Sequence, residues 1–291
     1  MKIRQKYSHI IAGTMTWGRW GKSLSTAEME ELLNYCLELG ITTFDHADIY
    51  GGYTNEADFG KAFKASGISR DGIQLISKCG IQLDTDSRKN KVNHYQYDTD
   101  YIVRSVEQSL SHLQTEYLDL LLLHRPSPLM HPDPVSRAIE KLRKEGKIRD
   151  FGVSNFTPSQ VGLIEKATKV QANQIECSLT QHKALFNGML DDGITHDRMM
   201  MSWSPLGSYY RKKGKKKDRI KKVLKKLKKK YKVSTTELLL AWIMTHPAEI
   251  HPVVGTTTKE RLALAVKAAD LKLDNEDWFR LLIASQGHDV P

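Results

Sequence analysis

The chain has 291 residues, 40% apolar and 27% charged, a composition that predicts one large folded α/β domain over residues 1–291 rather than a disordered chain. No apolar run is long enough to cross a membrane, and residues 1–10 lack a signal-peptide core. We therefore expect no membrane contact. Three cysteines without metal-ligand spacing predict no metal site and favour a reducing, cytoplasmic location. The net charge of +10 is concentrated in residues 211–232, which hold 15 Lys/Arg and one Asp, while the other 269 residues are mildly acidic.

Short apolar runs alternate with longer segments of helical periodicity along the whole chain. The apolar runs predict strands at 9–14, 41–45, 73–78, 118–124, 148–153, 172–176, 199–203 and 252–255. The segments between and after them predict helices at 26–39, 54–65, 99–113, 133–145, 158–167, 234–245, 258–270 and 274–284. Eight strand–helix units in a chain of this length predict a parallel (β/α)8 TIM barrel, with extra helices after the seventh strand and at the C-terminus.

Four ionisable residues stand out because they lie at or just beyond the ends of predicted strands. Asp45, Lys78 and His124 each close a strand, and Tyr50 follows Asp45 by five positions. Barrel enzymes assemble their active sites at this rim. Any one of the four, taken alone, is more often structural: a cap, a loop contact, a surface charge or a core histidine. Four on the same rim favour a functional site.

These four residue types suit the protonation of a carbonyl oxygen. A lysine ammonium beside a tyrosine favours the phenolate and so helps the phenol to donate its proton. An aspartate holds that lysine charged, and a histidine can donate a hydrogen bond that orients the substrate oxygen. No side chain supplies hydride, so a reduction at this site requires a nicotinamide cofactor.

Six motifs in order carry a resemblance to a known family: FDHADIYGGYTNEADFGKAF, LISKCG, LLLLHRP, GKIRDFGVSNFTPSQ, NQIECS and WSPLG. Over residues 8–291 the sequence resembles the aldo-keto reductase superfamily, and its closing WFRLLIASQGHDVP is similar to the bacterial YdhF-type oxidoreductases of that superfamily. The resemblance implies a TIM barrel that binds NADP(H) across the C-terminal rim and reduces aldehydes or ketones to alcohols. It makes Tyr50 the proton donor, with Lys78 and Asp45 tuning its acidity and His124 orienting the carbonyl.

The same resemblance assigns the residues that would hold the cofactor. It places Ser154, Asn155 and Gln174 at the nicotinamide carboxamide, Trp203 against the nicotinamide ring, Ser204, Pro205, Leu206, Gly207 and Ser208 at the pyrophosphate, Gly13 and Thr14 near the ribose, and Gly255, Thr256, Thr257 and Arg261 at the adenosine 2′-phosphate, with Lys259 as a further candidate. Helix capping is the alternative reading of Ser154 and Asn155. Gly255, Leu264 and Ala265 depart from the family pattern, which leaves the choice between NADPH and NADH open.

The lysine-rich segment, residues 211–232, predicts an amphipathic helix. Ile220, Val223, Leu224, Leu227 and Tyr231 form one apolar stripe, with lysines on the other face. We expect a solvated surface helix whose charge steers an anionic cofactor; binding of nucleic acid or an anionic membrane is the weaker alternative.

The substrate pocket is predicted above Tyr50 and His124, with the insertion 81–98 and the loop 125–131 as walls. Met15, Trp17, Trp20 and Tyr53 are the nearby aromatic or thioether residues, and such a wall favours small carbonyl substrates. The alternative function is an NADPH-sensing regulatory protein with little turnover. We expect no obligate protein partner.

Overall fold

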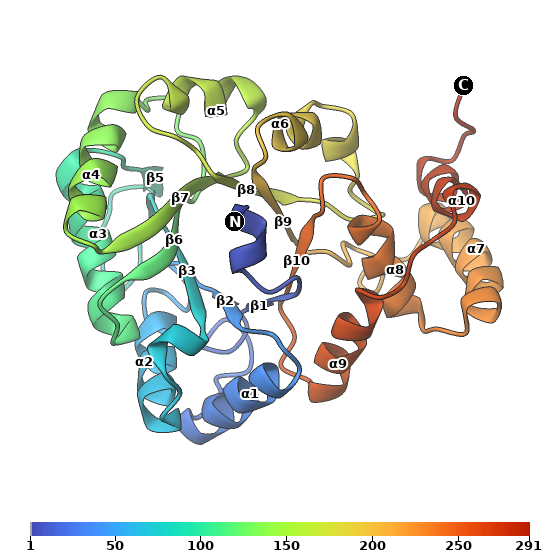
Figure 1. The fold of residues 1–291 in the computed structure, drawn as a ribbon, viewed down its shortest axis with the longest axis horizontal. Helices are drawn as coiled ribbons and strands as arrows, with labels where there is room; N and C mark the ends of the chain where they lie inside the picture. Colours follow the sequence, from blue (N-terminus) through green and yellow to red (C-terminus); the bar gives the residue numbers. More distant parts are fainter. Residues whose placement is uncertain (1) are drawn as a thin grey trace.

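Eight parallel strands close into a barrel in the computed structural model, which describes residues 2–291 (Figure 1). The strands are β1 (Ile11–Gly13), β2 (Thr43–Asp45), β3 (Gln74–Cys79), β6 (Leu118–Leu123), β7 (Ile148–Ser154), β8 (Ala172–Glu176), β9 (Met199–Trp203) and β10 (His251–Val254). Ile11 of β1 pairs with Val253 of β10, which closes the ring. The predicted (β/α)8 barrel is confirmed, and every predicted strand overlaps an observed one.

The helices surround this barrel, as the predicted alternation requires. They are α1 (Thr26–Glu38), α2 (Asn55–Ser66), α3 (Thr99–Leu113), α4 (Pro132–Lys144), α5 (Pro158–Glu165), α6 (Met189–Thr195), α7 (Lys215–Tyr231), α8 (Thr235–Met244), α9 (Lys259–Ala268) and α10 (Asn275–Gln286), with 3₁₀ turns η1 (Ile3–Lys6), η2 (Arg70–Gly72) and η3 (Lys183–Leu185). The sequence did not predict α6, which is only seven residues long and contains Gly193. It also did not predict the small hairpin of β4 (Ile81–Gln82) and β5 (His94–Tyr95) within the insertion 81–98.

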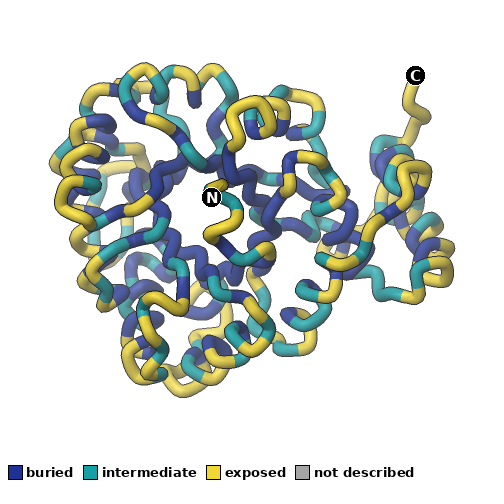
Figure 2. The backbone as a smooth tube through the Cα atoms, in the orientation of Figure 1, coloured by how far each residue is buried: buried dark blue, intermediate teal, exposed yellow. Residues whose placement is uncertain are grey.

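Two apolar layers stabilise the barrel, because its strands are buried on both faces. Leu120 and Leu122 of β6 point into the barrel interior with Met199 and Met201, whereas Leu121 packs against the surrounding helices. Figure 2 shows this as a dark, buried ring of strands inside a partly exposed ring of helices.

The N-terminal segment lies over one end of the barrel in Figure 1. The Lys6 ammonium lies 3.0 Å from Asp150 Oδ2, and the Tyr7 hydroxyl donates to the same oxygen at 3.1 Å. Asp150 is near the start of β7, so this contact covers the amino-terminal end of the strands. The carboxyl ends, where the four predicted catalytic residues lie, are at the opposite end.

The lysine-rich segment forms α7, which packs against α10 at the side of the barrel (Figure 1). Ile220, Leu224 and Leu227 are buried, which confirms the predicted apolar stripe. The Lys230 ammonium lies 2.6 Å from both Asp274 and Asp277, and so ties the two helices together. Among residues 2–291, no helix is long and apolar enough to span a membrane.

Candidate active site

The structure brings the four predicted catalytic residues together at the carboxyl ends of β2, β3 and β6. The Lys78 ammonium donates to Asp45 Oδ2 at 2.8 Å and to the Tyr50 hydroxyl at 3.1 Å. The His124 ring centroid lies 6.1 Å from that of Tyr50, in an edge-on arrangement. Lys78 is 1% exposed, so its charge is held by these partners and not by solvent.

Backbone hydrogen bonds hold Tyr50 in place relative to Lys78. The chain after β2 continues alongside β3, because His46 N donates to Ile76 O at 2.8 Å and Asp48 N donates to Lys78 O at 3.0 Å. The carbonyl of His46 accepts a third hydrogen bond from the Lys78 ammonium, at 2.7 Å. Sequence reasoning missed this role of His46, because a backbone acceptor leaves no residue-type signal.

Burial and charge set the protonation states of the site. Burial raises the pKa of Tyr50, and Lys78 opposes that rise. The lysine thus acts in the expected direction, but the net pKa lies above the ordinary value. Burial also works against the charge on Lys78, yet Asp45 and Tyr50 outweigh it and raise the pKa of the ammonium. Burial, Lys78 and Arg125 lower the pKa of His124 well below its ordinary value. The site therefore holds a charged lysine, a protonated phenol and a neutral imidazole.

A chain of hydrogen bonds links the four predicted catalytic residues, through Asp45, to the residues predicted to contact the nicotinamide. Gln174 Nε2 donates to Asp45 Oδ1 at 2.8 Å, and Ser154 Oγ donates to the Gln174 carbonyl at 3.0 Å. Asn155 Nδ2 donates to Ser154 Oγ at 2.8 Å, and Trp203 Nε1 donates to Asn155 Oδ1 at 3.0 Å. The sequence predicted these residues as a group but not the link from Gln174 to Asp45.

The capping alternative for Ser154 and Asn155 is wrong. The N-cap of α5 is Thr157, whose hydroxyl accepts from Gln160 N, while the Gln160 side chain accepts from Thr157 N. Asn155 instead adopts a left-handed backbone with φ of +62°, and its side-chain oxygen accepts a hydrogen bond from Trp203 Nε1.

Thr14, predicted near the ribose, is hydrogen-bonded within the protein. It is fully buried, and its hydroxyl donates to the Asp45 carbonyl at 3.0 Å and lies 2.9 Å from His46 Nδ1. Its backbone N–H also donates to Asp45 O, and its carbonyl accepts from Asn55 Nδ2 at 3.1 Å. Thr14 therefore supports the strand end beneath Asp45. Gly13, directly before it, is the last residue of β1.

Residues 204–208 form a tight turn directly after β9. Gly207 N donates to Ser204 O at 2.7 Å, and Ser208 N donates to Thr180 Oγ1 at 2.9 Å. A Cβ on Gly207 would lie 2.0 Å from Thr180 Oγ1 and 2.3 Å from Ser178 Oγ, so only glycine fits there. Two of the N–H groups predicted for a pyrophosphate are thus engaged within the protein. Pro205 has no N–H group to offer, and Ser204 and Leu206 are the remaining predicted residues of the turn.

The residues predicted for the 2′-phosphate lie together at the start of α9. Thr258 is the N-cap of this helix but its side chain makes no capping bond. Arg261 is exposed in the first turn, and Thr256 and Thr257 are half-buried just before it. Lys259 is paired with Glu31 at 2.6 Å. A helix start with hydroxyls and an exposed arginine has the chemistry to hold a phosphate.

One residue predicted near the pocket belongs to the main core instead, and another lies in a small apolar cluster against which Tyr50 packs. Trp17 is 1% exposed and packs between Phe44 and Phe59. The Tyr53 hydroxyl accepts from Leu83 N at 2.9 Å and anchors the insertion 81–98.

Met15 and Trp20 remain at the surface, 43% and 45% exposed. The Trp20 ring lies 6.2 Å from the Tyr50 ring, which makes Trp20 the aromatic neighbour of the predicted proton donor.

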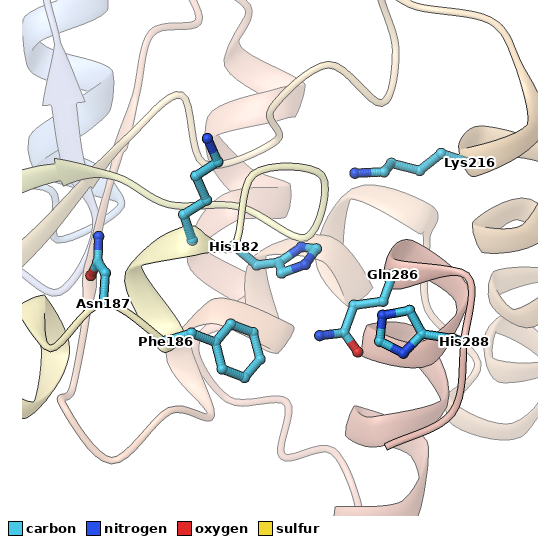
Figure 3. A pocket seen from close by; sticks show the side chains of 7 residues that line it. His182, Phe186, Asn187, Lys216, Gln286 and His288 are labelled. Carbon is cyan, nitrogen blue, oxygen red and sulfur yellow. The ribbon is translucent and has the colours of Figure 1, made fainter. Parts of the chain in front are cut away.

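A separate hollow of about 530 Å³ lies between η3, the start of α7 and the C-terminal tail (Figure 3). It is lined by His182, Lys183, Phe186, Asn187, Lys216, Gln286 and His288. Figure 3 shows the His182 ring and the Gln286 amide pointing into it from opposite sides. None of these seven residues is among those predicted for catalysis or cofactor binding, so this hollow is distinct from the candidate active site.

Comparison with known proteins identifies the same family that the motifs indicate. The model of the aldo/keto reductase family matches residues 9–284. The oxidoreductase YdhF of Escherichia coli (strain K12) is 37% identical, covering 98% of this chain and 96% of its own length. A 6-dehydroglucose reductase of Agrobacterium fabrum is 36% identical, covering 95% of each chain.

A solved structure extends this likeness to the fold. The aldo-keto reductase from Klebsiella pneumoniae in complex with NADPH has a TM-score of 0.77 at 23% identity, covering 98% of this chain and 92% of that chain. The predicted similarity to YdhF is confirmed by the sequence comparison, and the predicted barrel by the structural one. The chain belongs to the aldo/keto reductase family.

Proposed function

We propose that this protein is an NADP(H)-dependent oxidoreductase that reduces aldehydes or ketones to alcohols, with Tyr50 as the general acid. The observation that carries the proposal is the buried Lys78 ammonium, which is bonded at once to Asp45 and to the Tyr50 hydroxyl. A buried lysine held by a carboxylate and directed at a phenol stabilises the tyrosinate that proton donation leaves behind.

The division of labour follows from these contacts. The bound nicotinamide cofactor would supply the hydride that reaches the carbonyl carbon. Tyr50 donates its proton to the carbonyl oxygen, and Lys78 stabilises the resulting phenolate. Asp45 keeps Lys78 charged and in place. The neutral His124 imidazole donates a hydrogen bond to the same carbonyl oxygen and orients it.

The residues around the tetrad have the chemistry that a dinucleotide requires. Ser154, Asn155 and Gln174 combine hydroxyl, amide donor and amide acceptor groups, as recognition of a carboxamide demands. Trp203, fixed by its bond to Asn155, offers an indole face to the nicotinamide ring.

Further along the rim, the turn 204–208 would lie along the pyrophosphate, and Gly13 near the ribose. The start of α9, with Gly255, Thr256, Thr257 and Arg261, would take the 2′-phosphate, which favours NADPH over NADH.

The relatives support the same reaction class. One of them is named as a reductase of 6-dehydroglucose, a carbonyl compound, and a structural neighbour was solved in complex with NADPH. These properties belong to those proteins, and the intact tetrad is the reason to extend them to this chain.

A carbonyl panel with both cofactors tests the proposal. Purified protein is incubated with aromatic aldehydes, methylglyoxal and sugar-derived aldehydes, and consumption of NADPH or NADH is followed by absorbance. We expect turnover with NADPH and a kcat/KM at least about tenfold lower with NADH, because one phosphate–arginine pair contributes on the order of 1.5–3 kcal/mol. Tight NADPH binding without turnover across the panel would contradict the proposal and favour a cofactor-sensing role.

A further inference from the structure

We propose that the guanidinium of Arg125 forms an anion subsite beside the proton donor, so that the preferred substrates are carbonyl compounds that carry a carboxylate or phosphate group. This inference rests on the proposed reductase function and names the substrate class of that site. Arg125 directly follows His124 at the carboxyl end of β6.

The backbone of Arg125 is fixed. Its carbonyl accepts a hydrogen bond from the Tyr97 hydroxyl at 2.5 Å, and its N–H donates one to the oxygen of that hydroxyl at 3.2 Å. The preceding residue is held as well, since His124 N donates to Cys79 O at 2.9 Å. Tyr97 is buried and packs on Gly80, where a Cβ would lie within 2.1 Å of the ring. The base of the Arg125 side chain therefore has a defined position on the rim.

The head group of Arg125, by contrast, has few partners. Among residues 2–291 its hydrogen bonds come only from Nη1, at 3.3 Å to the His124 carbonyl and 3.4 Å to Ser154 Oγ, and no carboxylate lies within 4.0 Å. A guanidinium carries five N–H donors, so most of the donors of this half-buried group have no partner among the described residues.

Two other shielded arginines show how carboxylates can complete such a group, whereas the half-buried Arg143 bonds, within the described part of the chain, only to the neutral amide of Gln171. Arg198 binds both oxygens of Glu165 at 2.7 Å and also Asp192 at 2.9 Å. Arg70 binds Asp119 at 2.7 Å. Arg125 lacks such a carboxylate. A bound anion could accept hydrogen bonds from its guanidinium, as Glu165 does from that of Arg198.

The position of the guanidinium places the missing anion on the substrate. Arg125 Cζ lies 5.4 Å from the Trp203 ring centroid, and Nη1 reaches Ser154. Its charge lowers the pKa values of both Tyr50 and His124, although burial is the larger influence on each. Arg125 therefore lies beside the proposed nicotinamide residues and directly after His124, whose ring is 6.1 Å from that of Tyr50. The groups proposed for the cofactor phosphates lie elsewhere, in the turn 204–208 and at the start of α9.

Matched substrate pairs and two variants test the subsite. The pairs are 4-carboxybenzaldehyde with 4-formylbenzamide, and succinic semialdehyde with butanal. The wild type should prefer the anionic member of each pair. Arg125→Met should lower kcat/KM for the anionic substrates by about 10–100-fold, mainly through KM, and by less than about threefold for the neutral ones. Arg125→Lys should recover part of the loss, because it restores the charge but not the planar fork.

The control variant is Arg149→Met, which removes one positive charge near the opposite end of the barrel, at an exposed position early in β7. It should leave the preference unchanged. Equal losses on anionic and neutral substrates in Arg125→Met, or no preference in the wild type, would overturn the subsite while leaving the reductase proposal intact.

A binding measurement separates this inference from the reductase proposal. Affinities for 4-(hydroxymethyl)benzoate and its amide are measured by tryptophan fluorescence in the presence of NADP+. Arg125→Met should weaken only the carboxylate, by about 10–100-fold. That result without any turnover would support the subsite and contradict the reductase. Equal affinity of wild type and variant for the carboxylate would contradict the subsite.

Discussion

Positive charge occurs in two contrasting settings in this protein. Lys78 is buried and donates hydrogen bonds to Asp45, His46 and Tyr50 within 3.1 Å. The lysines of α7 lie on a solvent-exposed helix face, where Lys230 is the member tied to two carboxylates. One buried charge with fixed partners can alter the reactivity of a neighbour, whereas many solvated charges change mainly the long-range field.

The contrast also explains why net charge is a poor guide to function here. The +10 of the whole chain comes from the exposed segment 211–232, while the ammonium that the proposed chemistry needs is a single residue in β3.

The largest effect is expected at the buried lysine. Lys78→Met should lower kcat/KM by about 10³–10⁴-fold, because Tyr50 loses the charge that stabilises its phenolate. It should also destabilise the fold by about 3–5 kcal/mol, because Asp45 is left as a buried charge without its partner. Denaturant unfolding and steady-state kinetics check the two effects. Lys221→Met on the exposed face of α7 is the control, and a comparable loss there would contradict the comparison.

A smaller effect is expected at the link between the tetrad and the nicotinamide residues. Gln174→Leu removes the hydrogen bond to Asp45 Oδ1 and leaves that oxygen without this buried donor. We expect about 1–3 kcal/mol of lost stability and a roughly tenfold weaker affinity for NADPH. Chemical denaturation and cofactor fluorescence titration measure both. Unchanged stability and NADPH affinity would show that the hydrogen bond between Gln174 and Asp45 contributes to neither.

The pH profile should be flat through the neutral range. The pKa of His124 is lowered, so the imidazole stays neutral as pH falls through its ordinary value near ~6.5. The pKa of Tyr50 is raised, so the phenol stays protonated as pH rises toward ~10. Reduction needs both of these forms, and kcat/KM measured between pH 6 and 9, on the order of a three-unit window, should vary less than about threefold. A step near pH 6.5 would instead show a charged histidine.

The smallest effect is expected on α7. Replacing exposed Lys221, Lys225, Lys228 and Lys229 together by Gln should change kcat/KM and stability little, within about 0.5 kcal/mol per site. A modest rise in the KM for NADPH at low salt, absent at high salt, would reflect lost steering. A nucleic-acid complex that survives physiological salt and disappears in this variant would revive the alternative function of the segment.

Most of the barrel could be predicted because its signals are local. The strands are short apolar runs, and the tetrad residues interrupt that pattern at the strand ends. Trp17 was misplaced because an aromatic residue on a rim loop can face either the pocket or the core, and only its packing on Phe44 and Phe59 decides. The short helix α6 lacks enough residues to show a period.

The finer features of the site depend on geometry that a sequence does not encode locally. The bond from Gln174 to Asp45 joins residues 129 positions apart. The lack of a carboxylate partner for Arg125 becomes visible only when its contacts are compared with those of Arg198. The support that the Thr14 hydroxyl gives to the Asp45 carbonyl also joins residues that are far apart in the sequence.

The most direct test of the central claim is single-turnover reduction by Tyr50→Phe with NADPH already bound. Phenylalanine keeps the aromatic ring beside Trp20 and His124. It lacks the hydroxyl proton whose donation Lys78 is proposed to assist. The rate of hydride transfer should fall by about 10²–10⁴-fold, while the affinity for NADPH stays within about twofold of wild type. A hydride-transfer rate equal to that of the wild type would contradict Tyr50 as the proton donor.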